Sequence, residues 1–527
     1  MRVDEKTAIA AFLPVLASLV LAACGGKSSP APPPSGPFSD ASLKGQYAFS
    51  MSGVDLNGAF FARVGSFSAD GSGNILSGLE DVMDLSSGKG PAQISITGGT
   101  YEIEANGRGS ITLNTASGGL LVNLMMQSAS NGFIIEVDLN ATTSGTFNLQ
   151  TPSDFAASAL GHPYVFGLFG VSFLSQKAAP IAMAGQITGD GNGNITGGVM
   201  DTNDGNVGTP SGATAVTPGT YALDTNGNGT NFGRGMMTFN GRTYAFYIVD
   251  ATQFKMVEED SLGGSAGEAL EQSSAIPTEN AQINGGFVYL VSGESILGSQ
   301  GPVTRVARFT ADGAGGLSAI TLDDNNDGGN THISQGGNIS AATYAMDSAN
   351  PGSGRGSFTF KASGYEPFSD VFYLRSPTAG VTLETSKGVI ATGPFYAQAA
   401  GPFTLSASAG NYVANWSGVQ LGSTTIVPFA EDFVGQYTLA NSNSSNITGF
   451  ADYVDLGLST KTVFTNVGLA GTFTVNGDGT ANNHYKFALS GSPSVTVNFQ
   501  AYFVNSEKIL LVCSDSGRNF AGTINQQ

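Results

Sequence analysis

The sequence predicts an all-β protein built from four tandem antiparallel modules, and three observations lead to this prediction. Glycine accounts for 74 of the 527 residues, while charged residues make up only 12%, about half their share in an average soluble protein. Short runs of alternating apolar and polar residues, bounded by Gly, Asn and Asp, fill the chain after residue 40, as is typical of half-buried strands. The same landmarks also return four times in one order, which indicates an internal repeat.

The landmarks of the repeat define its boundaries. The first unit opens with LKGQYAFSMSG from residue 43, continues with FSADGSGNILSG from residue 67 and then with GTYEIEANGRGSITL from residue 99, and related segments follow in three later units. Every unit closes with a glycine and, five positions later, a glutamine: Gly145 and Gln150, Gly267 and Gln272, Gly393 and Gln398, and Gly522 and Gln527. We therefore predict four β modules at residues 43–150, 160–272, 283–398 and 408–527.

Module one contains eight short alternating segments joined by turn-length connections, which favours an antiparallel meander. Eight up-and-down strands can close into a barrel without unpaired edges, so we expect closed or nearly closed barrels, with β-sandwiches as the alternative. In the strand that follows Gly-Arg-Gly, apolar positions such as Ile111 and Leu113 alternate with polar ones and are expected to face the core. The topology resembles that of lipocalin-type barrels, although the Gly-x-Trp landmark of that family is absent.

The glycine-rich segment around Asp70-Gly71 permits three interpretations: a phosphate loop, a calcium loop or a hairpin turn. It recurs around residues 190 and 312 with Asp-Gly retained, and module four has Ser442-Asn443 instead. Residues that tolerate positive φ are what a tight turn between paired strands requires. The recurrence therefore favours a hairpin turn.

The N-terminal segment predicts export. Arg2 and Lys6 precede an apolar run from residue 8 to residue 23, which is short for a membrane span and typical of a secretion signal. Leu21-Ala22-Ala23-Cys24 resembles the lipobox of bacterial lipoproteins, in which the cysteine becomes the mature N-terminus and carries acyl chains. The resemblance implies a signal peptide at residues 1–23, lipidation of Cys24 and a membrane anchor, with a cleaved signal without lipid as the alternative.

A tether is expected after the lipid. Residues 24–42 comprise Cys24 and a stretch rich in Pro, Ser and Gly, a composition that forms a semi-extended spacer rather than a folded core. In bacterial lipoproteins an aspartate after the cysteine signals retention at the inner membrane. Because Gly25 stands there, the resemblance implies the outer membrane and a cell-envelope location.

A buried Arg–Glu pair is predicted in three of the four modules. The Gly-Arg-Gly landmark supplies an arginine, a glutamate lies nine residues before each closing glycine, and module four has Asn482 and Cys513 at these positions. Loss of both residues together is expected of a buried pair, because removal of one partner alone costs about 3–5 kcal/mol. Two unrelated surface residues are the alternative. The candidate pairs are Arg108 with Glu136, Arg234 with Glu258, and Arg355 with Glu384, and we expect Cys513 to act as a small apolar core residue.

Signals for catalysis or metal binding are scarce. The three histidines fall in three different modules, and the Gly-x-Ser-x-Gly match at 263–267 has no helix signal after it, as a hydrolase nucleophile would require. The best metal candidates are Asp323, Asn325 and Asp327, which match the first half of a calcium loop, but Ser334 stands where the bidentate acid belongs. A solvated turn is the favoured interpretation, and no cofactor is expected.

The function predicted from these observations is a non-catalytic one in the cell envelope: binding, adhesion or structure. A net charge of −19 argues against nucleic acid as a partner, because phosphates require basic surfaces. A glycan, a protein or a small apolar ligand are the partners left open, in addition to the membrane that holds the lipid. The alternatives are a carrier of a small apolar ligand in lipocalin-like barrels and an envelope hydrolase. The acids considered for the hydrolase are Glu102, Glu104, Asp81 and Asp324.

Overall fold

The computed structural model describes most of the chain after residue 37. The ranges are 38–87, 92–116, 118–225, 232–297, 300–334, 339–421, 429–439, 445–457, 461–475, 484–490 and 495–527. The predicted signal peptide, Cys24, most of the tether and Asn482 lie outside these ranges. Within them, no helix has both the length and the apolar character needed to cross a membrane.

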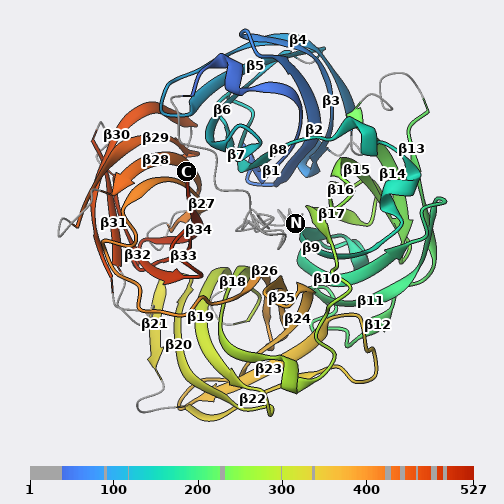
Figure 1. Cartoon of the computed structure of the whole chain (residues 1–527), viewed down its shortest axis with the longest axis vertical. Coiled ribbons are helices and arrows are strands. Elements are labelled where there is room, and N and C mark those ends of the chain that lie inside the picture. Colours follow the sequence, from blue (N-terminus) through green and yellow to red (C-terminus); the bar gives the residue numbers. More distant parts are fainter. Residues whose placement is uncertain are drawn as a thin grey trace, which may run out of the picture.

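The prediction of an all-β, antiparallel fold is confirmed, with one sheet in each predicted module (Figure 1). The first sheet is a closed barrel of consecutive strands: β1 (Lys44–Asp55), β2 (Phe60–Asp70), β3 (Asn74–Asp84), β4 (Ala92–Ile103), β5 (Arg108–Thr115), β6 (Gly118–Ser128), β7 (Asn131–Glu136) and β8 (Ala141–Leu149). The fourth is also closed: β27 (Gly410–Gln420), β28 (Phe429–Leu439), β29 (Asn446–Asp455), β30 (Thr462–Thr474), β31 (His484–Ser490), β32 (Val495–Phe503), β33 (Lys508–Cys513) and β34 (Arg518–Gln526).

The second and third sheets are curled and have nine strands each. The second comprises β9 (Pro163–Ser172), β10 (Ala179–Gly189), β11 (Asn194–Asp204), β12 (Thr214–Ala215), β13 (Gly219–Leu223), β14 (Arg234–Phe239), β15 (Arg242–Asp250), β16 (Gln253–Glu258) and β17 (Gly263–Glu271). The third comprises β18 (Asn284–Ser295), β19 (Gly301–Asp312), β20 (Leu317–Asn326), β21 (Gly329–Ser334), β22 (Ile339–Met346), β23 (Arg355–Ala362), β24 (Phe368–Ser376), β25 (Ala379–Glu384) and β26 (Val389–Ala397). In the second sheet β10 also pairs with β11, and in the third a single bridge joins Gly316 to Thr343. We refer to all four sheets as barrels.

Each barrel has its own core of inward-facing side chains. In module one this core includes Tyr47, Phe67, Ile111 and Leu113, all almost fully buried. The residues that correspond to Ile111 and Leu113 in modules two and three are buried in the same way. The alternation in the strand after Gly-Arg-Gly therefore does mark the core face, as expected.

One end of each of the first three barrels is closed by a short 3-10 helix that precedes the first strand. The helices are η1 (Asp40–Ser42), η4 (Ala157–Leu160) and η7 (Asn280–Gln282). In each of these barrels a tyrosine on β4, β13 or β22 donates its hydroxyl to a backbone carbonyl of the helix or of the residue that follows it: Tyr101 to Leu43, Tyr221 to Ala157, and Tyr344 to Ile283, at 2.8–3.0 Å. The remaining short helices are η2 (Leu85–Ser87), η3 (Pro152–Asp154) and η5 (Leu174–Gln176).

The segment around Asp70 is a hairpin turn between β2 and β3. Asp70 Oδ1 accepts hydrogen bonds from the backbone N–H groups of Ser72 and Asn74, and Gly71 and Gly73 have φ angles of 81° and 92°, which strain a side chain. Asp190 makes the same contacts in module two.

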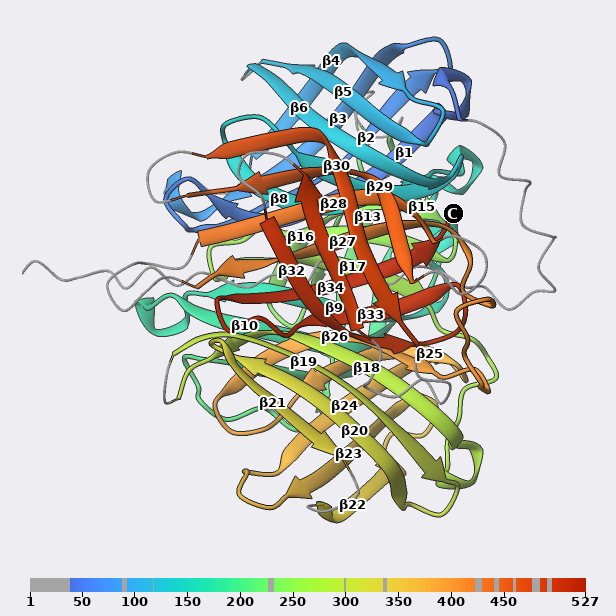
Figure 2. The same cartoon turned by 90° about the vertical axis from the view of Figure 1, so that its left-hand side faces the viewer.

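The four barrels follow one another around a common axis, so that module four lies against module one (Figures 1 and 2). The first and last strands of each barrel face this axis in Figure 1. Buried apolar clusters lie between the barrels as well as inside them: one spans modules one to three, one joins modules three and four, and two smaller ones join modules four and one. We call the four contact regions between neighbouring barrels seams and name each by its two modules.

Candidate functional site

The arginines of the Gly-Arg-Gly landmark lie in the seams rather than inside their own barrels. Arg108 donates through Nε and Nη2 to Asp452 of module four at 2.9 and 2.8 Å, and through Nη1 to Glu104. Arg234 and Arg355 repeat this arrangement with an aspartate of the preceding module, Asp81 and Asp201 respectively. The predicted contacts with Glu136, Glu258 and Glu384 are therefore wrong, because these arginines extend outward from the barrel wall.

The three glutamates lie inside the barrels and pair with other arginines. Glu136 accepts from Arg63 of β2 at 3.2 Å and from the Thr143 hydroxyl at 2.8 Å. Glu258 pairs with Arg242, and Glu384 with Arg305. Both members of each pair are buried, so each charge is compensated at the point where it is removed from water.

Module four explains why the joint loss of an arginine and a glutamate was assigned to the wrong arginine. Arg63, Arg305 and Phe433 occupy the same register position on the second strand of their barrels. Module four thus has lost Glu and Arg together, with Cys513 and Phe433 instead, and both are in its apolar core. Module two has Met183 at this position and supplies Arg242 from β15, which obscures the pattern in an alignment of the repeats.

Burial changes the acid–base properties of these groups. It raises the pKa of Glu258 to about 7, against the opposing effect of Arg242, and it raises the pKa of the Cys513 thiol. A thiol with a raised pKa is a poor nucleophile at neutral pH. Cys513 therefore fits the expected role of an apolar core residue.

Each seam contains a buried aspartate at the same register position on the third strand of a barrel. The four residues are Asp81, Asp201, Asp323 and Asp452. Three accept from an arginine of the next module, and tyrosine hydroxyls add a hydrogen bond at three seams: Tyr247 to Asp81, Tyr373 to Asp201, and Tyr502 to Asp323, at 2.5–2.6 Å. Sequence reasoning considered Asp81 and Asp323 for other roles and missed Asp201 and Asp452, although the recurrence of this aspartate in all four modules could have identified it.

The closing glutamine of every module reaches into the next module. Gln150 Nε2 donates to the carbonyls of Phe232 and Ile248, and Gln272 Nε2 to those of Ser353 and Leu374. Gln398 donates to Phe503. Gln527 completes the cycle by donating to the carbonyls of Asn106 and Met126 at 3.0 and 2.7 Å.

Two of the three candidate metal ligands, Asp323 and Asn325, contribute to the seam between modules three and four, while the Asp327 N–H donates to Pro302 within module three. Asp323 accepts from Tyr502 and contacts His332 Nδ1 at 2.8 Å, an interaction that raises the pKa of His332. Asn325 donates to the carbonyls of Cys513 and Arg518. Among the residues that the structure describes, no three His, Cys, Asp or Glu side chains are grouped as metal ligands. Of the acids considered for a hydrolase, Asp81 and Asp324 lie in different modules.

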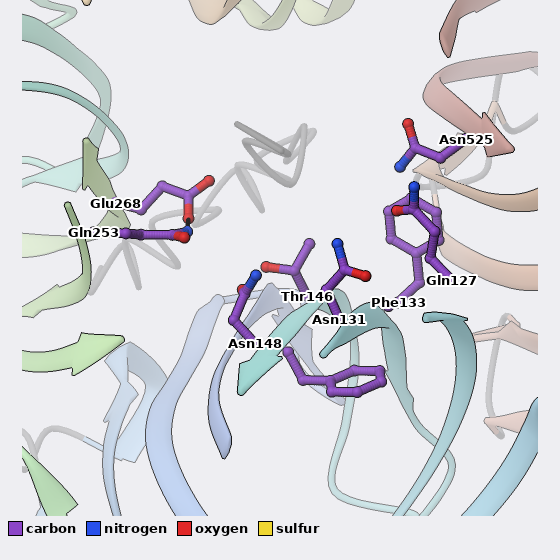
Figure 3. A pocket seen from close by; sticks show the side chains of 10 residues that line it. Gln127, Asn131, Phe133, Thr146, Asn148, Gln253, Glu268 and Asn525 are labelled. Carbon is purple, nitrogen blue, oxygen red and sulfur yellow. Dashed lines mark hydrogen bonds between the residues drawn. The ribbon is translucent and has the colours of Figure 1, made fainter. Parts of the chain in front are cut away.

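A small, shallow polar pocket, with about 20 Å³ of space for solvent, lies near the ring axis, where modules one, two and four meet (Figure 3). Gln253 Nε2 donates to Glu268 at 2.7 Å. The buried Lys255 ammonium lies 3.5 Å from the same carboxylate and donates to Thr146 of module one at 2.7 Å. The lining offers mainly amide and hydroxyl groups: Gln127, Asn131, Thr146, Asn148, Gln253, Glu268 and Asn525, with Phe133 and Phe147. We call this the axial pocket.

Two further pockets lie at the open ends of the first two barrels, away from η4 and η1. The pocket of module two has a volume of about 310 Å³, and its lining is mostly apolar, with Ile181, Met183 and Phe239 beside Arg242. The pocket of module one has a volume of about 390 Å³ and is bordered by Arg63 and several acids.

Comparisons with known proteins give no family for this chain. No protein-family model matches the sequence, and no curated protein matches it. A double mutant of the vaccine antigen transferrin binding protein B from Haemophilus parasuis Hp5 shows 11% identity and a TM-score of 0.18, with 76% of this chain and 83% of that chain covered. The isotype 1 protein of the same name from serogroup B Neisseria meningitidis shows 8% identity and a TM-score of 0.19, over 79% and 84% of the two chains. At these TM-scores the similarity is too distant to carry an argument about function.

Proposed function

We propose that this chain is an exported lipoprotein, anchored through Cys24 to the outer membrane, with a non-catalytic binding role in the cell envelope. The observation that carries the proposal is the closed ring. Every seam has a buried aspartate that accepts from an arginine or a tyrosine of the next module and a closing glutamine that donates to the next module, so the four barrels form one body rather than four independently moving domains.

A rigid ring presents its binding groups at fixed positions. Multivalent binding gains effective concentration only when the spacing of the sites matches the partner, and a ring fixes that spacing without the entropic cost of ordering linkers. The axial pocket combines amide side chains from modules one, two and four with the Thr146 hydroxyl and the Glu268 carboxylate, whereas Phe133 and Phe147 behind them are buried. These groups suit a polar envelope polymer such as a glycan better than an apolar compound.

A carrier of a small apolar ligand is the second candidate, and the pocket of module two favours it. Its apolar lining and its position at the open end of a barrel are typical of small-molecule sites. The aromatic filling of the four cores counts against a larger internal cavity.

The anchor can be tested by expression of the full chain in a bacterial host that has an outer membrane. We expect radiolabelled palmitate to be incorporated and the protein to fractionate with the outer membrane. The Cys24→Ser variant should lose the label and become soluble after export. Membrane association that persists in this variant would contradict the lipid anchor.

The binding role can be tested with the secreted Cys24→Ser chain on an array of bacterial envelope glycans. We expect saturable binding that Asn148→Ala weakens, since Asn148 lines the axial pocket. Asn114→Ala is the matched control, because Asn114 is an exposed amide on β5 of the same barrel. Equal loss in both variants, or release of sugar products from the array, would argue against a non-catalytic role of the axial pocket.

A further inference from the structure

The open end of the first barrel contains a buried carboxylate that is only partly paired. Glu80, on β3, is 1% exposed, and its Oε1 accepts from Arg63 Nη1 at 3.1 Å. Its Oε2 is buried and accepts no hydrogen bond from any residue that the structure describes. Arg63 makes no bond to Oε2, and its Nε and Nη2 are directed to Glu136 instead. A buried carboxylate oxygen without a donor is costly.

The repeat shows that the fold does not require an acid here. The register position of Glu80, opposite Gly65 on β2, is occupied by Met200 in module two, Leu322 in module three and Ala451 in module four. All three are buried apolar residues. The acid is thus particular to module one, and stability alone does not account for it.

The pocket beside Glu80 is both acidic and apolar. Asp55 and Asp84 border it together with Glu80, against the single cation Arg63, which Glu136 shares. Phe61, Val82, Ile94 and Leu120 provide apolar walls. A ligand that fits would carry a positive charge for the carboxylates and an apolar body for the walls.

We propose that the open end of the first barrel binds a small organic cation, a protonated amine on an apolar body, with Glu80 Oε2 accepting from the ammonium group. The ammonium supplies the donor that the protein lacks, and the apolar body displaces water from the walls. This proposal does not depend on the lipid anchor or on glycan binding at the axial pocket. Each of the three proposals can therefore fail while the others hold.

Isothermal titration calorimetry with the Cys24→Ser full chain tests the proposal, with hexylammonium as the probe and hexanol and hexanoate as neutral and anionic analogues. We expect hexylammonium to bind with one site per chain and both analogues to bind at least about tenfold more weakly. Equal affinity for hexanol would overturn the role of charge. Binding of calcium or potassium with none of hexylammonium would overturn the proposed ligand class.

Two variants of Glu80 keep the test interpretable. Glu80→Gln retains the shape of the side chain and should weaken hexylammonium binding about tenfold or more. Glu80→Met introduces the residue found in module two and should abolish the preference for hexylammonium over hexanol. Glu102→Gln is the matched control, because it removes an exposed charge of the same barrel. Near-ultraviolet circular dichroism checks that each variant is folded. Unchanged hexylammonium affinity in folded Glu80→Gln would overturn the proposal.

Discussion

The seam between modules two and three and the seam between modules four and one are built from the same parts, although only the first joins modules that are consecutive in sequence. Each has an arginine bound through two nitrogens to an aspartate of the preceding module and a glutamine that donates to two carbonyls of the next module. Ring closure is therefore encoded in the repeat itself and needs no dedicated closing segment.

The two seams differ in how they add to these shared contacts. The two–three seam has the Tyr373 hydroxyl on Asp201 and belongs to a large apolar cluster. The four–one seam has Met125 at the tyrosine position and two smaller apolar clusters. Both seams add polar contacts. At the two–three seam the neutral Asn203 amide donates to two carbonyls of module three, whereas at the four–one seam ionisable groups take part: Asp432 accepts from the Ser144 hydroxyl at 2.6 Å, and Lys461 donates to backbone carbonyls of module one. We infer that the four–one seam depends more on charge.

Substitution of the seam arginines should have the largest effect on stability. Arg108→Ala leaves Asp452 buried without its guanidinium, which should cost about 3–5 kcal/mol and open the ring, because no linker holds modules four and one together. Arg355→Ala should cost a similar amount but leave its seam associated. Hydrogen exchange by mass spectrometry should show loss of protection in β5, β6 and β29 only for Arg108→Ala. Equal opening of both seams would contradict the comparison.

The glutamines should have a smaller effect. Gln527→Ala removes the donor for the carbonyls of Asn106 and Met126, and Gln272→Ala does the same at the two–three seam. Each loss is expected to cost about 1–3 kcal/mol. Denaturant unfolding measures the cost, and small-angle scattering should show expansion only for Gln527→Ala. If neither variant changes the midpoint, the glutamines do not stabilise the seams.

Much of the fold could be predicted from the sequence because strands alternate and turns need particular residues. The repeat boundaries, the inward alternation at Ile111 and Leu113, and the Asp-Gly turns all express local rules. The ring could not be predicted, since the outward faces of the strands are also apolar and a pattern of period two does not say what covers them. The Arg–Glu prediction failed for the same reason: Arg108 reaches outward to Asp452 of module four, whereas Glu136 pairs with Arg63 inside its own barrel.

Charge at the four–one seam predicts a pH dependence that the other seam lacks. Burial raises the pKa of Asp432 to about 7, opposed by Ser144 and Lys461, while Glu136 and Glu431 raise it further. The folded state therefore holds the Asp432 proton more tightly than the unfolded state does. The contribution of Asp432 to the free energy of unfolding is largest below about pH 4. It falls as the pH rises to about 7, by at most about 1.4 kcal/mol per pH unit. The position corresponds to Ala182 at the two–three seam.

The Asp432→Asn variant checks this assignment. It should remove the part of the pH dependence that belongs to the four–one seam, so the difference in unfolding free energy between it and the parent chain should grow from pH 4 to pH 7. Urea unfolding at several pH values measures this difference. A difference that does not vary with pH would show that Asp432 stays in one protonation state throughout.

The smallest effect should come from the tyrosine that distinguishes the two seams. Tyr373→Phe makes the two–three seam resemble the four–one seam, and it removes one of the three hydrogen bonds to Asp201 while Arg355 keeps the charge paired. Because Arg355 still donates to both carboxylate oxygens of Asp201, the cost should be near the net value of a typical hydrogen bond, about 0.5–1.5 kcal/mol, rather than the larger value for a bond on which a charge depends. Thermal unfolding should show a slightly lower midpoint with the ring still closed. A cost as large as that of Arg355→Ala would mean that the hydroxyl, rather than the guanidinium, is the principal partner of the buried aspartate.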